Sequence, residues 1–360
     1  MDKKRLFISA LVLAVLAGLV YWQIRTWQKF DWQKFASNLQ GINLWLIFLG
    51  VALIYLDYVL RALRWRILLR PVKQTTTARL VPPTMIGFTG MALFGRPGEL
   101  IRPLLIARKE GITMSSQMGV WIVERIFDMG AFALIMAINV FVSAESLRKL
   151  PGFKPSPGEH QIDVLLRFRI AGGLLLAGVG VAALIAFLIR RRPEKAAAGT
   201  ERLLMRFSPK FAQNIGRRIH TFGEGLHTVP DMKSFFQLTT VSIAIWLIIG
   251  VTYVVVTHAF HDRALSGMTL SHVLLLTFAS VVGGVLQLPV VGGGSQLATI
   301  TTLKSIFGIS AELATSCGIM LWLVTFMSVI PAGLFLAHRE HVSLIKVEEE
   351  SIEEEENLEA

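Results

Sequence analysis

The chain has 360 residues, of which 53% are hydrophobic and only 17% are charged, and its mean hydropathy is +0.57. This composition excludes an ordinary soluble protein and indicates an all-α polytopic membrane protein, because long apolar runs recur along the chain. The net charge of +11 follows the predicted membrane topology, so it does not indicate nucleic-acid binding.

Six segments are predicted to be full membrane spans, because each is near or above the roughly 20 residues that cross the hydrocarbon core. They are Leu6–Ile24, Ile42–Leu60, Met118–Val142, Ile170–Ile189, Phe236–His258 and Leu313–Ala337. The first span ends in Tyr21-Trp22 rather than in a small-residue cleavage site. We therefore expect residues 1–41 to form an uncleaved anchor helix and an outer loop.

The basic residues predict the orientation of the spans. With the N-terminus inside, the inner segments 1–5, 61–80, 96–109, 190–234 and 339–346 carry 25 Lys and Arg, against 9 in the outer segments 25–41, 143–169 and 259–271. The loops are short, so the positive-inside rule applies and predicts a multi-pass plasma-membrane protein with both termini inside. Residues 341–360 are predicted to form a disordered acidic tail.

The end of the second span carries several charged residues. Asp57, Arg61 and Arg64 share one helical face. Arg64, Trp65 and Arg66 are interpreted as interface anchors, since snorkelling and aromatic belts explain them. Asp57 lies deeper in the span and is harder to explain in this way.

The next apolar stretch, Leu80–Ala107, is interrupted by glycines and a proline, and its halves of about 15 and 11 residues are too short to cross alone. We predict a helical hairpin that enters the membrane and returns. Glu99 lies in the first turn after the break, flanked by Arg96 and Arg102. A helix N-terminus with arginines can hold a phosphate, although an ordinary Glu99–Arg102 surface pair explains the pattern equally well.

The third predicted span contains three ionised residues within five positions, Glu124, Arg125 and Asp128. Each costs about 2.5–3.5 kcal/mol at a bilayer centre, so they must pair, line a wet cavity, or both. Arg125 reaches Asp128 at i,i+3 spacing, and Trp121 one turn earlier could shield it. A functional pathway is favoured over a purely structural ion pair.

A second broken stretch, Leu270–Phe307, contains Pro289 and three consecutive glycines. At a shift of 197 residues it resembles the first stretch, with Glu99-Leu100 aligned to Gln296-Leu297. The two stretches are entered from opposite sides in the predicted topology, which is typical of an inverted repeat with paired broken helices. If the first half of this stretch spans instead, the C-terminus moves outside.

Motifs for other functions are absent from the sequence. There is no P-loop, no Gly-x-Ser-x-Gly and no His-Glu-x-x-His, and Cys317 is the single cysteine. We therefore expect no metal and no cofactor. The longest soluble loop, residues 190–234, is too short for an ordinary catalytic domain, so any enzymatic site would lie within the membrane or at its surface.

Four motifs resemble the flippase-like family found as the transmembrane region of lysylphosphatidylglycerol synthases. They are Arg61-Ala-Leu-Arg64-Trp65, Gly95-Arg-Pro-Gly-Glu-Leu-Ile-Arg102, Glu124-Arg-Ile-Phe-Asp128 and Leu288-Pro-Val-Val-Gly-Gly-Gly294. The resemblance covers about residues 40–340 and implies a flippase-like transmembrane domain over residues 42–340. The chain departs from the family at Phe94-Gly95, where Leu-Pro is usual, and at Gln296, where Glu is usual. The soluble aminoacyl-transferase domain is missing, so the resemblance implies lipid translocation and not lysyl transfer.

The leading hypothesis is a translocator that moves a polar, phosphate-bearing lipid between leaflets. The predicted substrate-binding residues are Arg125, Glu124, Asp128, Arg96, Glu99, Arg102, Asp57, Arg61 and Gln296. Arg125, with Arg96 or Arg102, would hold the anionic group. The expected partners are membrane lipids and a lipid-synthesising enzyme. Two alternatives stay open: an intramembrane enzyme with Glu124 or Asp128 as general base, and a scaffold whose charges only hold helices together.

Overall fold

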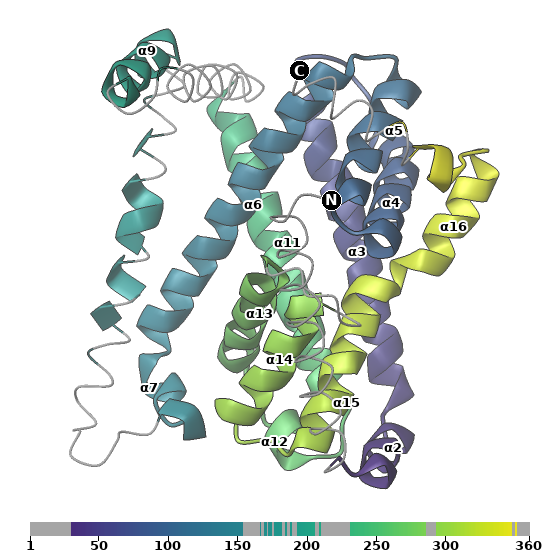
Figure 1. Cartoon of the computed structure of the whole chain (residues 1–360), viewed down its shortest axis with the longest axis vertical. Helices are drawn as coiled ribbons and strands as arrows, with labels where there is room; N and C mark the ends of the chain where they lie inside the picture. The colour runs from purple at the N-terminus through teal and green to yellow at the C-terminus, as the bar shows by residue number, and fades with distance from the viewer. Residues whose placement is uncertain are drawn as a thin grey trace, which may run out of the picture.

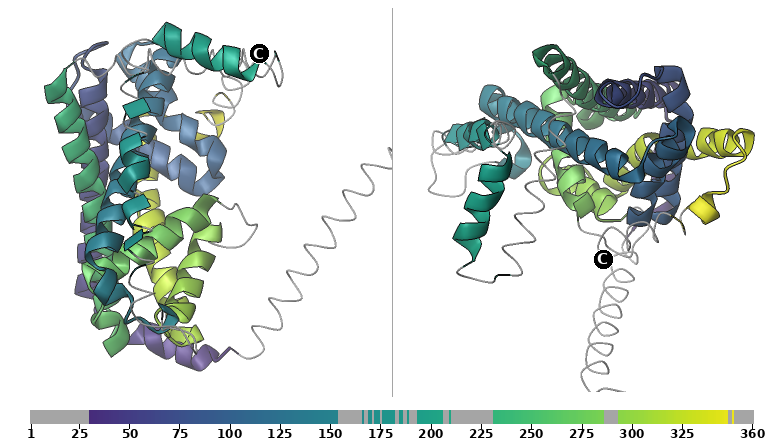
Figure 2. Two further views of the ribbon diagram at one scale, coloured as in Figure 1. Left: turned by 90° about the vertical axis from the view of Figure 1, so that its left-hand side faces the viewer. Right: turned by 90° about the horizontal axis from the view of Figure 1, so that it is seen from above.

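The computed structural model describes residues 30–153, parts of 166–209, residues 231–285 and 293–347, and residue 350. This part of the chain is helical, and no strand occurs among the described residues. The helices form an elongated bundle (Figure 1). In it, α11 (Met232–His258) packs along α3 (Leu44–Leu69) and also contacts α6 (Met114–Val142) and α13 (Leu270–Val285). Seen from above in Figure 2, α9 (Pro193–Leu204) lies apart from the bundle.

Within the part of the chain that the structure describes, four helices are long and apolar enough to cross a membrane. They are α3 (Leu44–Leu69), α6 (Met114–Val142), α11 (Met232–His258) and the continuous run Ala311–Arg339. These four confirm four of the six predicted spans. The predicted anchor Leu6–Ile24 lies outside the described residues, and Ile170–Ile189 is described only in fragments.

Polar residues at the helix starts explain where the long helices begin. The side chains of Asn43, Thr113, Asp231 and Ser310 accept hydrogen bonds from amides of the first turns of their helices, as N-cap residues do. At Asp231 the hydrogen bonds from the side chain and backbone of Ser234 hold the pKa of the carboxyl below its usual range.

The first broken stretch forms a helical hairpin, which we call the first hairpin and which comprises residues 77–110. It consists of α4 (Thr77–Phe94), the 3-10 turn η1 (Arg96–Leu100) and α5 (Ile101–Glu110). Gly95 makes the turn with φ of +76°, a backbone region that L side chains rarely adopt. At Gly87 the two arms are so close that a Cβ atom would collide with Arg102. The predicted hairpin is therefore present at the level of the helices.

The second broken stretch also contains two helices packed against each other, which we call the second hairpin. They are α13 (Leu270–Val285) and α14 (Gly293–Ser305). Of the predicted break, Pro289 and Gly292 lie outside the described residues, whereas Gly293 and Gly294 begin α14. The described part of α13 has 16 residues and packs against α14.

The last predicted span, Leu313–Ala337, is interrupted rather than regular. It consists of α15 (Ala311–Trp322), the π-helical segment η3 (Leu323–Met327) and α16 (Val329–Arg339). Pro331 has no amide hydrogen to donate to the carbonyl four residues earlier. That carbonyl belongs to Met327 at the end of the π-helical segment, so the proline explains why the regular hydrogen-bond ladder changes there.

The structure describes only residues 341–347 and 350 of the predicted acidic tail, residues 341–360. Residues 344–347 are helical, and Val347 is buried against the first hairpin in a cluster that includes Leu104. Lys109 forms an ion pair with Glu340, and Arg108 forms one with Glu350. Apolar side chains and the basic end of α5 together hold this part of the tail.

The rest of the bundle is completed by short elements, namely α2 (Trp32–Gln40), α7 (Ala144–Leu147), η2 (Pro151–Phe153) and α12 (Arg263–Ser266).

Candidate functional site

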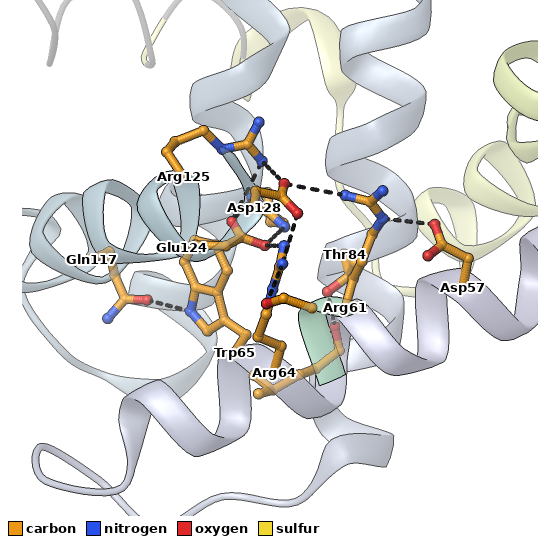
Figure 3. A network of polar contacts seen from close by, with 12 residues as sticks. Asp57, Arg61, Arg64, Trp65, Thr84, Gln117, Glu124, Arg125 and Asp128 are labelled. Carbon is orange, nitrogen blue, oxygen red and sulfur yellow. Dashed lines mark hydrogen bonds and ion pairs between the residues drawn. The ribbon is translucent and has the colours of Figure 1, made fainter. Parts of the chain in front are cut away.

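Seven charged side chains form one connected set of ion pairs between α3, α5 and α6, which we call the charge network. Its members are Asp57, Arg61, Arg64, Arg102, Glu124, Arg125 and Asp128. Figure 3 labels its members on α3 and α6. Four arginines against three carboxylates leave one excess positive charge. Within an apolar helix bundle, such charges are sustained only by pairing and hydrogen bonding.

Arg64 of α3 lies at the centre of the charge network. Its guanidinium donates to Glu124 Oε1 and to Asp128 Oδ1, each at 2.7 Å, and to Ser242 Oγ of α11 at 3.1 Å. The side chain is fully buried. The interpretation of Arg64 as an interface anchor was therefore wrong. Its guanidinium forms ion pairs with two carboxylates on α6 inside the protein and does not extend to the membrane surface.

This pairing also explains the length of α3. The predicted span ended at Leu60, whereas the helix continues to Leu69. Trp65, the second predicted anchor, is likewise fully buried, and its indole N–H donates to Gln117 Oε1 of α6 at 3.0 Å. The last turns of α3 therefore pack inside the protein.

Arg102 connects the first hairpin to α6. Its guanidinium donates to Glu124 Oε1 at 3.0 Å and also pairs with Glu124 Oε2. The same guanidinium carbon lies 4.2 Å from the centre of the Trp65 ring and 5.2 Å from that of Phe88. Cation–π contacts of this kind stabilise a desolvated cation. In the described part of the chain these contacts involve Arg61 and Arg102, whereas the sequence predicts that Trp121 shields Arg125.

Asp57 and Arg61 of α3 form the other end of the network. Arg61 Nε donates to Asp57 Oδ2 at 2.7 Å, as the i,i+4 spacing predicts, and Arg61 Nη1 lies 3.9 Å from Asp128 Oδ2. Asp57 Oδ1 is buried and accepts no hydrogen bond within the described part of the protein. The deep carboxylate that the sequence singled out is thus an incompletely satisfied member of the network.

Arg125 of α6 is the most accessible member of the network and the one held most loosely. Its side chain is 37% exposed, and its Nη2 atom lies 3.6 Å both from Glu124 Oε2 and from Asp128 Oδ2. These separations exceed ordinary hydrogen-bond lengths. The pair with Asp128 confirms the predicted i,i+3 contact, and Arg125 Nε is buried without a hydrogen-bond partner among the described residues.

A small pocket lies beside Arg125. It is lined by residues of the first hairpin and of α6, which are Gly87, Phe88, Met91, Glu99, Arg102, Trp121 and Arg125. Its volume of about 20 Å³ is sufficient for about one water molecule. The geometry brings Glu99 to the same pocket as Arg102 and Arg125, so the carboxylate is near both cations even though Arg102 pairs with Glu124.

Two predicted site residues are not part of this arrangement. Arg96 begins η1, but its side chain lies outside the described residues. Gln296 is buried on α14 of the second hairpin, and no ion pair or hydrogen bond among the described residues joins it to the charge network. The polar contacts near it are neutral, with Ser280 Oγ 2.6 Å from Ser295 Oγ and Tyr253 donating to Ser280 at 3.3 Å.

The described residues contain no group of three or more His, Cys, Asp and Glu side chains arranged to hold a metal ion.

Comparison with known proteins identifies a family for the chain. The family model described as the lysylphosphatidylglycerol synthase TM region matches residues 8–333. Neither a curated protein nor a solved structure gives a significant match to the chain.

Proposed function

Because the chain belongs to the lysylphosphatidylglycerol synthase TM region family, whose model covers nearly the whole chain, we propose that it is a lipid translocator. Its substrate would be a lipid with a phosphate-bearing head group, and it would pass between leaflets without chemical change. The phosphate would bind Arg125, with Arg102 and the remaining charge network behind it.

The observation that carries this proposal is that the four arginines lie at different distances from their carboxylate partners. Arg61, Arg64 and Arg102 each have a carboxylate oxygen within ordinary hydrogen-bond distance, whereas Arg125 has both of its carboxylates at 3.6 Å and is 37% exposed. A planar guanidinium matches phosphate oxygens well. The excess positive charge of the network would thus be presented to the substrate at Arg125.

The size of the pocket suggests what must move. A volume of about 20 Å³ is too small for a phosphate group, so the described conformation would be a closed one. Arg102 is the residue of α5 that joins the first hairpin to Glu124 of α6. We propose that the first hairpin swings away from α6 when the substrate enters, and that the substrate phosphate replaces Glu124 as the partner of Arg102.

The second hairpin would provide the opposite gate. Its two helices pack closely against each other, as those of the first hairpin do, and paired broken helices at the membrane midplane are a known basis for alternating access. Its buried polar side chains are neutral, as at Gln296 and Thr299. We propose that the second hairpin contacts the polar head group through neutral side chains, so that the phosphate stays paired with the arginines of the charge network.

A scaffold role is favoured by one specific observation, the complete pairing of Glu124. Both of its oxygens pair with Arg102, and one also accepts from Arg64. Such a carboxylate could serve only to hold α3, α5 and α6 together. The same pairing argues against Glu124 as a general base, since a base must reach the proton that it abstracts.

The deciding experiment measures head-group movement across proteoliposomes. Labelled phosphatidylglycerol is offered to wild type, to Arg125→Gln and to Arg66→Gln, a control that removes an arginine of α3 outside the charge network. We expect Arg66→Gln to transport like wild type and Arg125→Gln to lose transport while keeping its melting temperature. Equal transport by all three would overturn the role of Arg125. No transport of any lipid by wild type would favour the scaffold.

A further inference from the structure

A second and much larger cavity, of about 470 Å³, lies at the opposite end of the bundle from the first hairpin. Its walls come from α2, from α12 and its preceding loop, and from the turn that precedes α15, which gather at the lower end of Figure 1. Two hydrogen bonds connect neighbouring parts of these walls. Ser316 Oγ of α15 donates to the Phe35 carbonyl of α2 at 3.5 Å, and the Asn43 amide donates to the Ala259 carbonyl at 2.9 Å.

This cavity is separate from the charge network. Gly41, which precedes α3, lines the cavity, whereas Arg64 lies 20 residues beyond Leu44, where α3 begins. At 1.5 Å per residue the two places are about 30 Å apart along the helix. None of the predicted site residues lines this cavity, and the proposed translocation does not use it.

The side chains that line the cavity offer hydrogen-bond donors and positive charge. Lys34 provides an ammonium group and His261 an imidazole. Asn38 contributes an amide nitrogen, Nδ2, that is buried and donates no hydrogen bond within the described part of the chain. Because a buried donor without an acceptor is unfavourable, this atom would gain from a ligand oxygen placed in the cavity.

The backbone and the one lining carboxylate are consistent with an anionic ligand. Ser310, the N-cap of α15, lies in the wall, so the positive end of a 12-residue helix adjoins the cavity. Asp262 is also in the wall, but its Oδ1 already accepts from the amides of Ala264 at 2.8 Å and Leu265 at 3.3 Å. Its charge is thereby directed at the start of α12.

The place of α2 indicates where the ligand comes from. This short helix directly precedes α3, a helix of membrane-spanning length, so it lies at the level of the membrane surface. Trp32 at its start is 55% exposed, as is common for aromatic residues at the head-group level. A cavity of about 470 Å³ lies in the range of ordinary ligand sites and far exceeds the space that a lone phosphate ion would fill.

We propose that this cavity binds the phosphate-bearing head group of a lipid in the leaflet next to α2, with Lys34 and Asn38 donating to the phosphate. The ligand chemistry is that of a phosphate ester, and the size of the cavity assigns it to a lipid rather than to the free ion. Binding here is independent of whether the protein moves lipids.

The test measures binding to the full chain in a neutral detergent by isothermal titration calorimetry. The probes are dihexanoylphosphatidylglycerol, inorganic phosphate, and dihexanoylglycerol, which has the same acyl chains without the phosphate. The variants are Lys34→Gln and Asn38→Asp, with Lys233→Gln at the far end of α11 as the charge-matched control. Lys34 is exposed, so its replacement keeps the test decisive even if Asn38→Asp fails to fold.

We expect saturable binding of the phospholipid, weakened about tenfold by Lys34→Gln and more by Asn38→Asp, and unchanged in Lys233→Gln. The other two probes should bind at least tenfold more weakly than the phospholipid. Equal phospholipid affinity in wild type and Lys34→Gln would overturn the site. Inorganic phosphate that binds as tightly as the phospholipid would overturn the assignment to a lipid, and equally tight dihexanoylglycerol would overturn the role of the phosphate. Loss of transport in the proteoliposome experiment would leave these outcomes unaffected.

Discussion

Arg64 and Glu124 form an ion pair at 2.7 Å between α3 and α6 in which both side chains are fully buried. Removing either charge would unbalance a buried network, because Arg64 also pairs with Asp128 and Glu124 also pairs with Arg102. The pair is extended on one side by Asp128 and on the other by Arg102, so three helices depend on it. This dependence distinguishes the residues that hold the three helices together from Arg125, which lies 3.6 Å from both of its carboxylate partners and which we propose as the substrate ligand.

Removing the charge of Glu124 should therefore cost more stability than it would at an accessible carboxylate. We expect Glu124→Gln to lower the free energy of unfolding by roughly 3–5 kcal/mol, since Arg64 and Arg102 would lose their shared partner. Glu99→Gln, at a partly exposed carboxylate of the neighbouring pocket, should change it by less than about 0.5 kcal/mol. Denaturant unfolding in detergent measures both, and similar stabilities of the two variants would contradict a structural role for Glu124.

Arg64 should not tolerate a lysine, although the charge is kept. The guanidinium bonds Glu124, Asp128 and Ser242 at once, and the single ammonium of lysine cannot reproduce this planar arrangement. We expect Arg64→Lys to cost about 2–3 kcal/mol of stability. Arg66→Lys, two residues further along the same helix, is the matched control and should be close to neutral. Equal melting temperatures of the two variants would show that the geometry of the guanidinium is not required.

The sequence was sufficient to find the helices and most of the charged residues of the site. Apolar run length identified four spans that are present, and glycine and proline breaks located the first hairpin and the pair of packed helices α13 and α14. The i,i+3 and i,i+4 spacings correctly paired Arg125 with Asp128 and Arg61 with Asp57. These successes concern residues close together in the chain, where helical geometry alone decides which side chains meet.

What the sequence missed are contacts between distant helices. Arg64 lies 60 residues from Glu124 and Arg102 lies 22 residues from it, and no local pattern specifies which helices pack together. Arg64 was wrongly predicted to lie at the membrane interface, because an arginine near the end of a span can be explained there as well as in the protein interior. The available signal was the helical face that it shares with Arg61 and Asp57, which indicated that its side chain points inward with theirs.

The start of the C-terminal tail should stabilise the first hairpin. Val347 is buried against α5, whereas Ile345 two residues earlier is 64% exposed. We expect Val347→Ala to raise hydrogen–deuterium exchange in residues 101–110 and to cost about 1–2 kcal/mol of stability, as removal of buried methyl groups does. Ile345→Ala makes the matched deletion at an exposed position and should leave the exchange unchanged. Unchanged exchange in the Val347 variant would mean that the tail does not support α5.

The turn of the first hairpin should depend on the absence of a side chain at Gly95. Its φ of +76° combined with ψ of −136° is a backbone conformation that is strained for any other residue. We expect Gly95→Ala to cost about 1–3 kcal/mol. Gly119 is helical within α6 and has no neighbouring atom near its missing Cβ, so Gly119→Ala should be neutral or stabilising by up to about 1 kcal/mol. Thermal unfolding in detergent compares the two variants. Equal stability of the Gly95 and Gly119 variants would show that Gly95 does not adopt this positive φ in the folded protein.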